Sequence, residues 1–292
     1  MTWRRRAAST PSWRAEAVRV ALVQTRTPAS QAAALDHVLP LARQAADAGA
    51  TLILTPEGTN ILQKDRDRLK AALTTVEADP VVCGLRDLAR ERGVHVLVGS
   101  ALVDAGGEKA ANRSLLVGPD GGILAGYDKL HMFDVDLPTG ETARESAAYT
   151  PGDRAITALA GEGRLGLTIC YDMRFPALYR ALALAGAEVM TVPAAFTRPT
   201  GEAHWEILLR ARAIETGSFV LAPAQGGFHE DGRGTWGRSL AVGPWGEVLG
   251  VLDHDEPGFL VADLDLPAAA RARRSIPALA NARAFSGPEP LA

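Results

Sequence analysis

The sequence has few of the features that mark whole classes of protein. Its 292 residues include only two cysteines, Cys83 and Cys170, too few for a disulfide framework, so a reducing compartment such as the cytoplasm is expected. The 31 basic and 34 acidic residues give a net charge of -3, without the basic excess typical of nucleic-acid or membrane-surface proteins. No uninterrupted apolar segment approaches the ~20 residues that a membrane span needs. We therefore expect neither a nucleic acid nor a membrane as a partner.

Several signatures of enzyme classes are also missing. There is no Gly-x-x-x-x-Gly-Lys phosphate loop, no Gly-x-Gly-x-x-Gly after an expected strand, and no Gly-x-Ser-x-Gly elbow of a serine hydrolase. The six histidines show no close ligand spacing, which argues against a zinc or iron site; they are His37, His95, His131, His204, His229 and His254. We expect no metal and no cofactor.

Strand-like and helix-like segments alternate along most of the chain. Both hairpins and strand–helix–strand units occur and no linker divides them, which predicts one α/β domain with mixed sheets over residues 17–275. The arginine-rich residues 1–16 are expected to be a disordered tail, and residues 276–292 a tail that is peripheral or at a subunit interface. The expected strands are 18–24, 51–54, 94–98, 112–117, 122–127, 164–170, 188–192, 219–222, 239–242, 247–251 and 259–263, and the expected helices are about 29–48, 79–92, 176–185 and 201–216, the last capped by Thr200.

Four chemically capable side chains lie where this pattern breaks. Glu57 and Lys129 each follow closely on an expected strand, Cys170 ends a third, and Glu145 lies in a polar loop. In α/β folds the carboxyl ends of strands are where ligands bind, so these side chains can converge at one edge of a sheet. Taken singly, each of these residues can also be interpreted as an ordinary core or loop residue. Cys83 lacks such an association with acidic and basic loop residues, and we interpret it as a packing residue.

The chemistry of these residues fits attack by a thiol on a carbonyl carbon. A free thiol has a pKa of ~8.5 and needs a base, which the carboxylate of Glu57 could be. Lys129 and the backbone N–H of Tyr171 could stabilise the oxyanion. The acid form of Glu57 could then protonate the leaving nitrogen and activate the water that hydrolyses the thioester.

Three ordered motifs resemble the nitrilase superfamily of carbon–nitrogen hydrolases. They are Pro56-Glu57-Gly58, Tyr127-Asp-Lys-Leu-His131 and Ile169-Cys-Tyr-Asp-Met-Arg-Phe-Pro176, and the likeness covers about residues 18–275. Within the superfamily, the chain is most similar to the branch of deaminated-glutathione amidases and ω-amidases. The motif Tyr171-Asp-Met-Arg-Phe-Pro176, the helix that contains His204-Trp-Glu and the segment Ala224-Gln-Gly-Gly-Phe-His229 resemble the deaminated-glutathione amidases more. Ala177 departs from the family, in which an acidic residue commonly follows Arg-Phe-Pro.

The resemblance implies a fold, an activity and an assembly. It implies a four-layer αββα sandwich that forms a homodimer or a higher homo-oligomer, and a Glu–Lys–Cys triad in which Glu145 positions Lys129. The implied reaction is hydrolysis of a non-peptide C–N bond in a small carboxylic or keto-acid amide, with deaminated glutathione favoured. The alternatives are an ω-amidase acting on 2-oxoglutaramate, a carbamoyl-amine hydrolase or a nitrilase; the intact triad argues against a non-enzymatic scaffold.

Several residues near these motifs are candidates for substrate binding. They are Tyr171, Arg174, Phe196, Thr197, His204 and Asn60, which stands where animal members of the family carry an aromatic residue. Arg174 could bind a substrate carboxylate or anchor the catalytic loop through an ion pair, and we favour the second. His204 could equally lie on the surface, and Phe196 and Thr197 could pack as ordinary loop residues. Arg212 falls on the apolar stripe of its helix and needs a carboxylate or a buried carbonyl, unless it only borders that stripe.

Overall fold

The computed structural model describes residues 17–137, 140 and 142–288 of the chain, so the expectation for residues 1–16 lies outside the described part. Two six-stranded sheets form the body. One has the order β16-β1-β2-β3-β4-β5 and the other the order β15-β14-β11-β10-β9-β8, and each contains parallel and antiparallel pairs. The strands of the first sheet are β1 (Val18–Gln24), β2 (Leu52–Leu54), β3 (His95–Val103), β4 (Ala111–Val117), β5 (Ile123–Asp128) and β16 (Gly258–Leu264); those of the second are β8 (Ile156–Ala160), β9 (Gly163–Leu167), β10 (Val189–Thr191), β11 (Phe219–Ala222), β14 (Leu240–Val242) and β15 (Val248–Val251).

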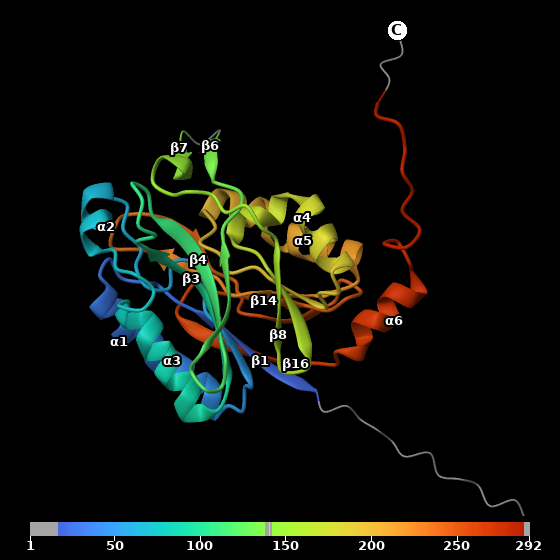
Figure 1. Ribbon diagram of the computed structural model, residues 1–292, viewed down its shortest axis with the longest axis horizontal. Helices are drawn as coiled ribbons and strands as arrows, with labels where there is room; N and C mark the ends of the chain where they lie inside the picture. The colour runs from blue at the N-terminus through green and yellow to red at the C-terminus, as the bar shows by residue number, and fades with distance from the viewer. Residues whose placement is uncertain (1–16, 138–139, 141, 289–292) are drawn as a thin grey trace, which may run out of the picture.

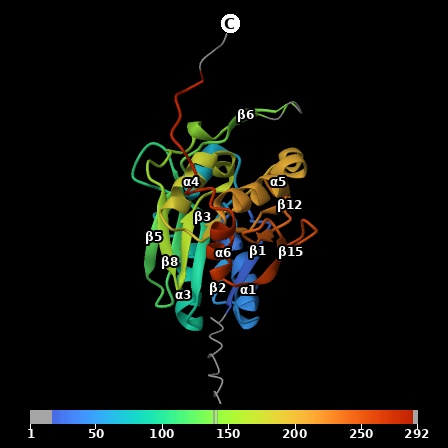
Figure 2. The same cartoon turned by 90° about the vertical axis from the view of Figure 1, so that its right-hand side faces the viewer.

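Helices cover the outer face of each sheet. Helices α1 (Gln31–Asp47) and α3 (Pro80–Arg92) pack on the first sheet, and α4 (Pro176–Leu184) and α5 (Arg198–Thr216) pack on the second. Figures 1 and 2 show the two helix pairs on different sides of the molecule. The four layers are therefore helix, sheet, sheet and helix, as the resemblance implied.

The alternation of side chains along β1 explains how one sheet serves two cores. Val20 and Leu22 face the second sheet and belong to the core between the sheets. Ala21 and Val23 point the other way and belong to the core under α1 and α3. Because successive residues of a strand point to opposite faces, a strand that is apolar throughout must be covered on both sides.

The expected elements are largely confirmed, with three corrections. Helix α5 begins at Arg198 with Thr197 as its N-cap, so Thr200 lies inside the helix. Strand β9 ends at Leu167, so Cys170 lies beyond the strand rather than at its last position. Residues 267–275 form helix α6 (Pro267–Ser275), on which Ala269 is fully buried, although the sequence predicted no helix there.

Smaller elements complete the fold. They are α2 (Arg66–Ala72), the hairpin of β6 (Asp134–Asp136) and β7 (Thr142–Arg144), the hairpin of β12 (Gly226–Phe228) and β13 (Gly234–Trp236), and two 3₁₀ turns, η1 (Glu145–Ala147) and η2 (Cys170–Arg174). The last described residues of the chain run away from the body (Figure 1). Among the helices of the described residues, none is both long and apolar enough to cross a bilayer.

Candidate active site

The ends of strands from both sheets bring four predicted residues together. Glu57 follows β2, Lys129 follows β5, and Cys170 follows β9 by three residues. Glu145 opens η1, and its backbone N–H donates to the carbonyl of Phe133. The site therefore spans the two sheets.

Lys129 lies between two carboxylates. Its Nζ is 2.9 Å from Oε1 of Glu57, and 2.9 and 2.8 Å from the two carboxylate oxygens of Glu145. The side chain is only 2% exposed. Burial acts to lower the pKa of Lys129, but the charges of Glu145 and Glu57 outweigh it and hold the pKa well above its usual value. Lys129 is therefore a permanent buried cation.

Glu57 is fixed by donors on both carboxylate oxygens. Oε1 accepts from Lys129 and from Nδ2 of Asn112, 2.9 Å away, and Oε2 accepts from the backbone N–H of Ala195 at 2.9 Å. The thiol of Cys170 lies close enough to this carboxylate to act on its pKa. Burial acts to raise the pKa of Glu57, but Lys129 and these hydrogen bonds keep it below its usual value. Glu57 is thus ionised and lies beside the Cys170 thiol.

A β-bulge in β3 shapes the loop that carries Glu57. The register of β3 against β4 shifts between Val98 and Ala101, and in this bulge Oγ of Ser100 accepts from the backbone N–H of Gly58 at 2.9 Å. A Cβ at Gly99 would lie 1.8 Å from the carbonyl oxygen of Thr55. Only glycine permits this close approach, so the bulge and the loop can pack directly.

Cys170 has a left-handed backbone, with φ of 49°. It opens η2, and its backbone N–H donates to the carbonyl of Pro193 at 2.9 Å. The residue is 8% exposed. Burial and the nearby charge of Glu57 raise the pKa of the thiol well above its usual value, against a smaller opposing effect of Lys129. The Cys170 side chain is therefore a neutral thiol rather than a thiolate.

The buried carboxylate of Asp172 joins the segment that carries Cys170 to the segment that carries Lys129. It accepts from the hydroxyl of Tyr127 at 2.6 Å and from the backbone N–H of Ile169 at 2.9 Å. It also meets both the backbone N–H of His131, at 3.1 Å, and the ring Nδ1, at 2.7 Å. His131, two residues after Lys129, thus has Asp172 as its partner.

Three of the candidate substrate-binding side chains meet around Arg174. Its guanidinium carbon lies 5.3 Å from the ring centre of Phe196 and 5.9 Å from that of Tyr171. Its Nη2 is 3.3 Å from Nδ1 of His204, which is exposed. Within residues 17–137, 140 and 142–288, Arg174 forms no ion pair with a carboxylate, so the ion-pair role that the sequence favoured is absent there. A half-buried cation beside the nucleophile remains available to an anion.

Two other predicted residues have different surroundings. Asn60 is fully buried; its Nδ2 donates to Asp79 at 2.7 Å and to the carbonyl of Leu102 at 2.9 Å, and its Oδ1 accepts from the N–H of Leu102. The amide of Asn60 is therefore already occupied by partners within the fold. Thr197 caps α5, and its hydroxyl lies 2.8 Å from that of Thr200.

Arg212 has both of the partners that the sequence required of it. Its Nε donates to the carbonyl of Met173 at 2.8 Å, and its Nη1 lies 2.5 Å from a carboxylate oxygen of Glu215. The residue is buried, so the alternative that it only borders the apolar stripe is wrong. Since Met173 belongs to η2, Arg212 ties α5 to the turn that begins with Cys170.

Sequence reasoning missed three buried residues that contact this site. Asn112 donates to Glu57 and, at 3.2 Å, to Glu145. Asp172 was noted only as part of a motif. Gln225 is the third residue, and its Nε2 donates to the backbone carbonyl of Glu57 at 2.9 Å. A signal for Asn112 was present: the hairpin around residues 118–122 sets Arg113 opposite Asp128, and so places Asn112 opposite Lys129.

The described residues hold no group of three or more His, Cys, Asp or Glu side chains arranged to bind a metal ion. The site itself offers two carboxylates already neutralised in part by Lys129. What it can perform with its own groups is proton transfer and nucleophilic attack.

Comparisons with known proteins point to one family. The family model for carbon-nitrogen hydrolase matches residues 19–274. A Yersinia enterocolitica protein named deaminated glutathione amidase is 40% identical over 243 residues, 82% of this chain and 84% of that protein. The solved C. elegans NitFhit protein has a TM-score of 0.86 at 29% identity over 92% of this chain and 65% of that longer chain. An amidase from Nesterenkonia sp. AN1, solved with the acetamide moiety of fluoroacetamide covalently added at its active site cysteine, has a TM-score of 0.75 at 31% identity over 91% of this chain and 97% of its own.

Proposed function

Because this chain belongs to the carbon–nitrogen hydrolase family, we propose that it is a thiol-dependent amidase with Cys170 as its nucleophile. The observation that carries the proposal is the buried Cys170 thiol beside an ionised Glu57 and the permanent cation Lys129. Because a base lies beside the neutral thiol, the reaction does not require a thiolate in the resting enzyme. Its proton can pass to Glu57 as sulfur attacks the carbonyl carbon.

The first half of the reaction forms a thioester. Sγ of Cys170 bonds to the amide carbon, the thiol proton moves to Glu57, and the carbonyl oxygen becomes an oxyanion. The ammonium of Lys129 and the N–H of Tyr171 are the proposed stabilisers of that charge. Glu57 then returns its proton to the nitrogen, the C–N bond breaks, and ammonia or an amine leaves.

The second half hydrolyses the thioester. Water attacks the same carbon while Glu57 takes one of its protons. The C–S bond breaks, and the sulfur regains a proton from Glu57. Glu145 does not react in this scheme; its proposed role is to hold Lys129, which it contacts through both carboxylate oxygens.

The favoured substrate is deaminated glutathione or a similar small keto-acid amide. Similarity to proteins of that name supports it, and so does Arg174, a half-buried cation without a carboxylate partner in the described chain. An ω-amidase acting on 2-oxoglutaramate would use the same catalytic groups, because that substrate also carries a carboxylate. A carbamoyl-amine hydrolase and a nitrilase are the further alternatives. Because Ala177 departs from the family pattern, the side chains of the substrate pocket decide between these activities.

The test combines a substrate panel with covalent trapping. We expect deaminated glutathione to have the highest kcat/KM among keto-acid amides, ureido acids and nitriles, assayed by release of the acid product. With a slow amide, mass spectrometry should find an acyl group on the peptide that contains Cys170 and none on that of Cys83. Cys170→Ala should reduce kcat by about 10³-fold or more.

Two results would reject this function. One is turnover of a nitrile with none of any amide. The other is full activity in Cys170→Ala, which would exclude a thiol mechanism; Cys83→Ser is the matched control and should keep wild-type kinetics.

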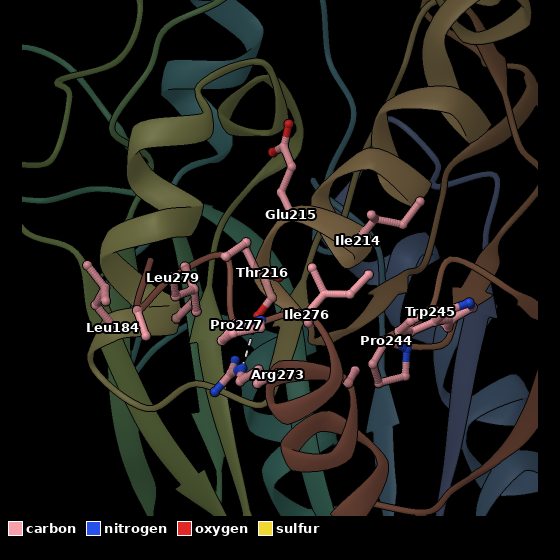
Figure 3. A pocket seen from close by; sticks show the side chains of 15 residues that line it. Leu184, Ile214, Glu215, Thr216, Pro244, Trp245, Arg273, Ile276, Pro277 and Leu279 are labelled. Carbon is pink, nitrogen blue, oxygen red and sulfur yellow. Dashed lines mark hydrogen bonds between the residues drawn. The ribbon is translucent and has the colours of Figure 1, made fainter. Parts of the chain in front are cut away.

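We further propose that two copies of this chain associate through a groove at the ends of α4, α5 and α6. The groove has a volume of about 450 Å³, and Figure 3 shows the labelled apolar side chains Leu184, Ile214, Trp245 and Ile276 around it. Helix α5 buries one apolar stripe in the core and exposes another, which includes Ile207 and Ile214. An exposed apolar surface continuous with a groove is typical of a subunit interface. Residues 276–280 line the groove, so this association would place the segment at the subunit interface.

The oligomeric state can be measured by analytical ultracentrifugation. We expect a dimer for the wild type and a monomer for Ile214→Glu. Leu159→Glu is the matched control, since Leu159 is 53% exposed and Ile214 57%, but Leu159 lies on β8, outside the groove. A monomeric wild type, or a dimer that survives Ile214→Glu but not Leu159→Glu, would contradict this interface.

We also propose a cytoplasmic location. Neither Cys83 nor Cys170 forms a disulfide, and the thiol at position 170 must stay reduced to react.

A further inference from the structure

Asn112 contacts the same carboxylate oxygens as the catalytic lysine. It is the second residue of β4, 3% exposed, and its backbone carbonyl accepts from the N–H of Lys129 at 3.0 Å. Its Nδ2 lies 2.9 Å from Oε1 of Glu57 and 3.2 Å from Oε1 of Glu145. The ammonium of Lys129 is 2.9 Å from each of these two oxygens. Two donors, one charged and one neutral, thus bridge the two glutamates.

The two carboxylates fix the orientation of the Asn112 amide. If the amide were reversed, its Oδ1 would face both carboxylates, and acceptor would meet acceptor. In the orientation that remains, Oδ1 is buried and has no hydrogen-bond partner among the described residues. A buried acceptor without a partner is unfavourable. The contacts of the NH₂ group with Glu57 and Glu145 must therefore outweigh this cost.

We propose that Asn112 is a positioning residue for the hydrolysis, which fixes the carboxylates of Glu57 and Glu145 around Lys129 and so keeps Glu57 in place to receive the Cys170 proton. This inference rests on the proposed thiol amidase function. A neutral donor suits the task because it orients Glu57 without adding a second positive charge, which would weaken Glu57 as a base. Without Asn112, Oε1 of Glu57 would retain Lys129 as its single side-chain donor.

The charges around Glu57 make this role visible in the pH dependence. The titratable groups that face Glu57 are Lys129 from the end of β5, Glu145 from η1, Cys170 from η2, and Tyr149 after η1. Lys129 is the cation among them. The hydrogen bond from Asn112 is one of the contacts that lower the pKa of Glu57. Its loss should therefore raise the pH at which Glu57 becomes protonated and stops acting as a base.

The experiment compares pH profiles of kcat/KM for the full-length enzyme. Asn112→Leu should move the acidic limb to higher pH. Asn112→Asp, which puts a third carboxylate beside the first two, should move it further. On the plateau, kcat should fall about 10- to 100-fold in both variants, with little change in KM, because the base is misplaced while the substrate pocket is intact. Asn112→Ser, a smaller change, provides a third variant should either of the others fold poorly.

Ser114→Ala is the matched control. Ser114 is fully buried on the same strand, but its hydroxyl contacts the carbonyl of Val98 rather than a catalytic group. The acidic limb of the pH profile of Ser114→Ala should coincide with that of the wild type. An unshifted limb in any folded Asn112 variant, with activity lost only in proportion to unfolded protein, would overturn the proposal. Full activity of Cys170→Ala would instead overturn the underlying function, so the two failures are distinguishable.

Discussion

At the scale of single residues, the state of the Cys170 thiol governs how the protein should react with modifying reagents. Many catalytic cysteines are activated as thiolates by a lowered pKa. Here burial and the adjacent Glu57 raise the pKa of the thiol, so the free enzyme holds a protonated nucleophile. Activation is therefore expected to occur only with a carbonyl in place, when the thiol proton passes to Glu57.

This state predicts a specific pH dependence of labelling. With methyl methanethiosulfonate, which is not an amide and so does not mimic the substrate, modification of Cys170 should be slow at pH 7. Its rate should keep rising through pH 9, since the thiolate fraction is still growing there. Peptide mass spectrometry gives the rate for Cys170, and the half-buried Cys83 in the same molecule provides an internal comparison. A rate that is fast and independent of pH between 6 and 9 would show a resting thiolate instead.

The residues of the candidate active site could be predicted from the sequence to different degrees. Glu57, Lys129 and Cys170 could be predicted because each interrupts or follows an apolar strand, where a polar group needs an explanation. Asn112 could not be singled out in this way, because an Asn at the start of a strand is ordinary. Its function depends on the strand pairing that sets it beside Lys129. The hydrogen bond of Asn60 to the buried Asp79 could not be foreseen either, because the two residues are nineteen positions apart in the sequence.

At the scale of elements, Asp172 makes two catalytic segments a single unit. Its carboxylate has four hydrogen-bond contacts, one with the N–H of Ile169, the residue before η2, and three with Tyr127 and His131. All of these partners are donors or can act as donors. An amide in place of the carboxylate would set its NH₂ group against one of them in either orientation.

Asp172→Asn is therefore expected to lower both stability and activity. The free energy of unfolding should fall by about 2–3 kcal/mol, since at least one buried donor loses its acceptor. Tyr127→Phe removes one donor and keeps the carboxylate, so it should cost only about 1 kcal/mol. Urea unfolding measures both losses, and kcat should fall more in Asp172→Asn. Equal urea midpoints for the wild type and Asp172→Asn would argue against this coupling.

The elements themselves show where sequence patterns suffice. Strands β1 and β11 begin and end where the sequence predicted, because continuous apolar runs between polar residues mark strands covered on both faces. Strands β6 and β7 were missed. Each has three residues, which are exposed or half-buried and carry no apolar pattern. Helix α6 was missed because its main anchors are tertiary. Arg273 on α6 donates to the carbonyls of Thr216 and Ala187, 57 and 86 residues away in the sequence.

At the scale of the whole molecule, His229 links folding stability to pH. It is buried between Thr235, whose hydroxyl is 2.7 Å from Nε2, and the carbonyl of Thr27, 3.4 Å from Nδ1. Burial lowers the pKa of His229 to about 4. An unfolded histidine titrates near pH ~6.5, so between these values the unfolded chain binds the extra proton. The folded state should therefore lose stability as the pH falls from about 6.5 to 4.

The loss can be isolated by comparing variants. Between pH 7 and pH 4, the wild type should lose roughly 3 kcal/mol more than His229→Gln, which has no imidazole to protonate. Contributions from carboxylates such as Glu57 are common to both proteins and cancel. His254→Gln, at an exposed position, is the control and should match the wild type. Denaturant unfolding at each pH gives the difference; parallel curves for the wild type and His229→Gln would exclude this role.

The charges around Lys129 also bear on how a turnover ends. Two carboxylates, Glu57 and Glu145, face one ammonium, and the Cys170 thiol is neutral, so the site carries one net negative charge. An amide enters this site without charge at the reacting group, but hydrolysis converts that group into an anion a few ångströms from Glu57. The repulsion favours departure of the acid, so the enzyme should show little product inhibition and little tendency to run in reverse.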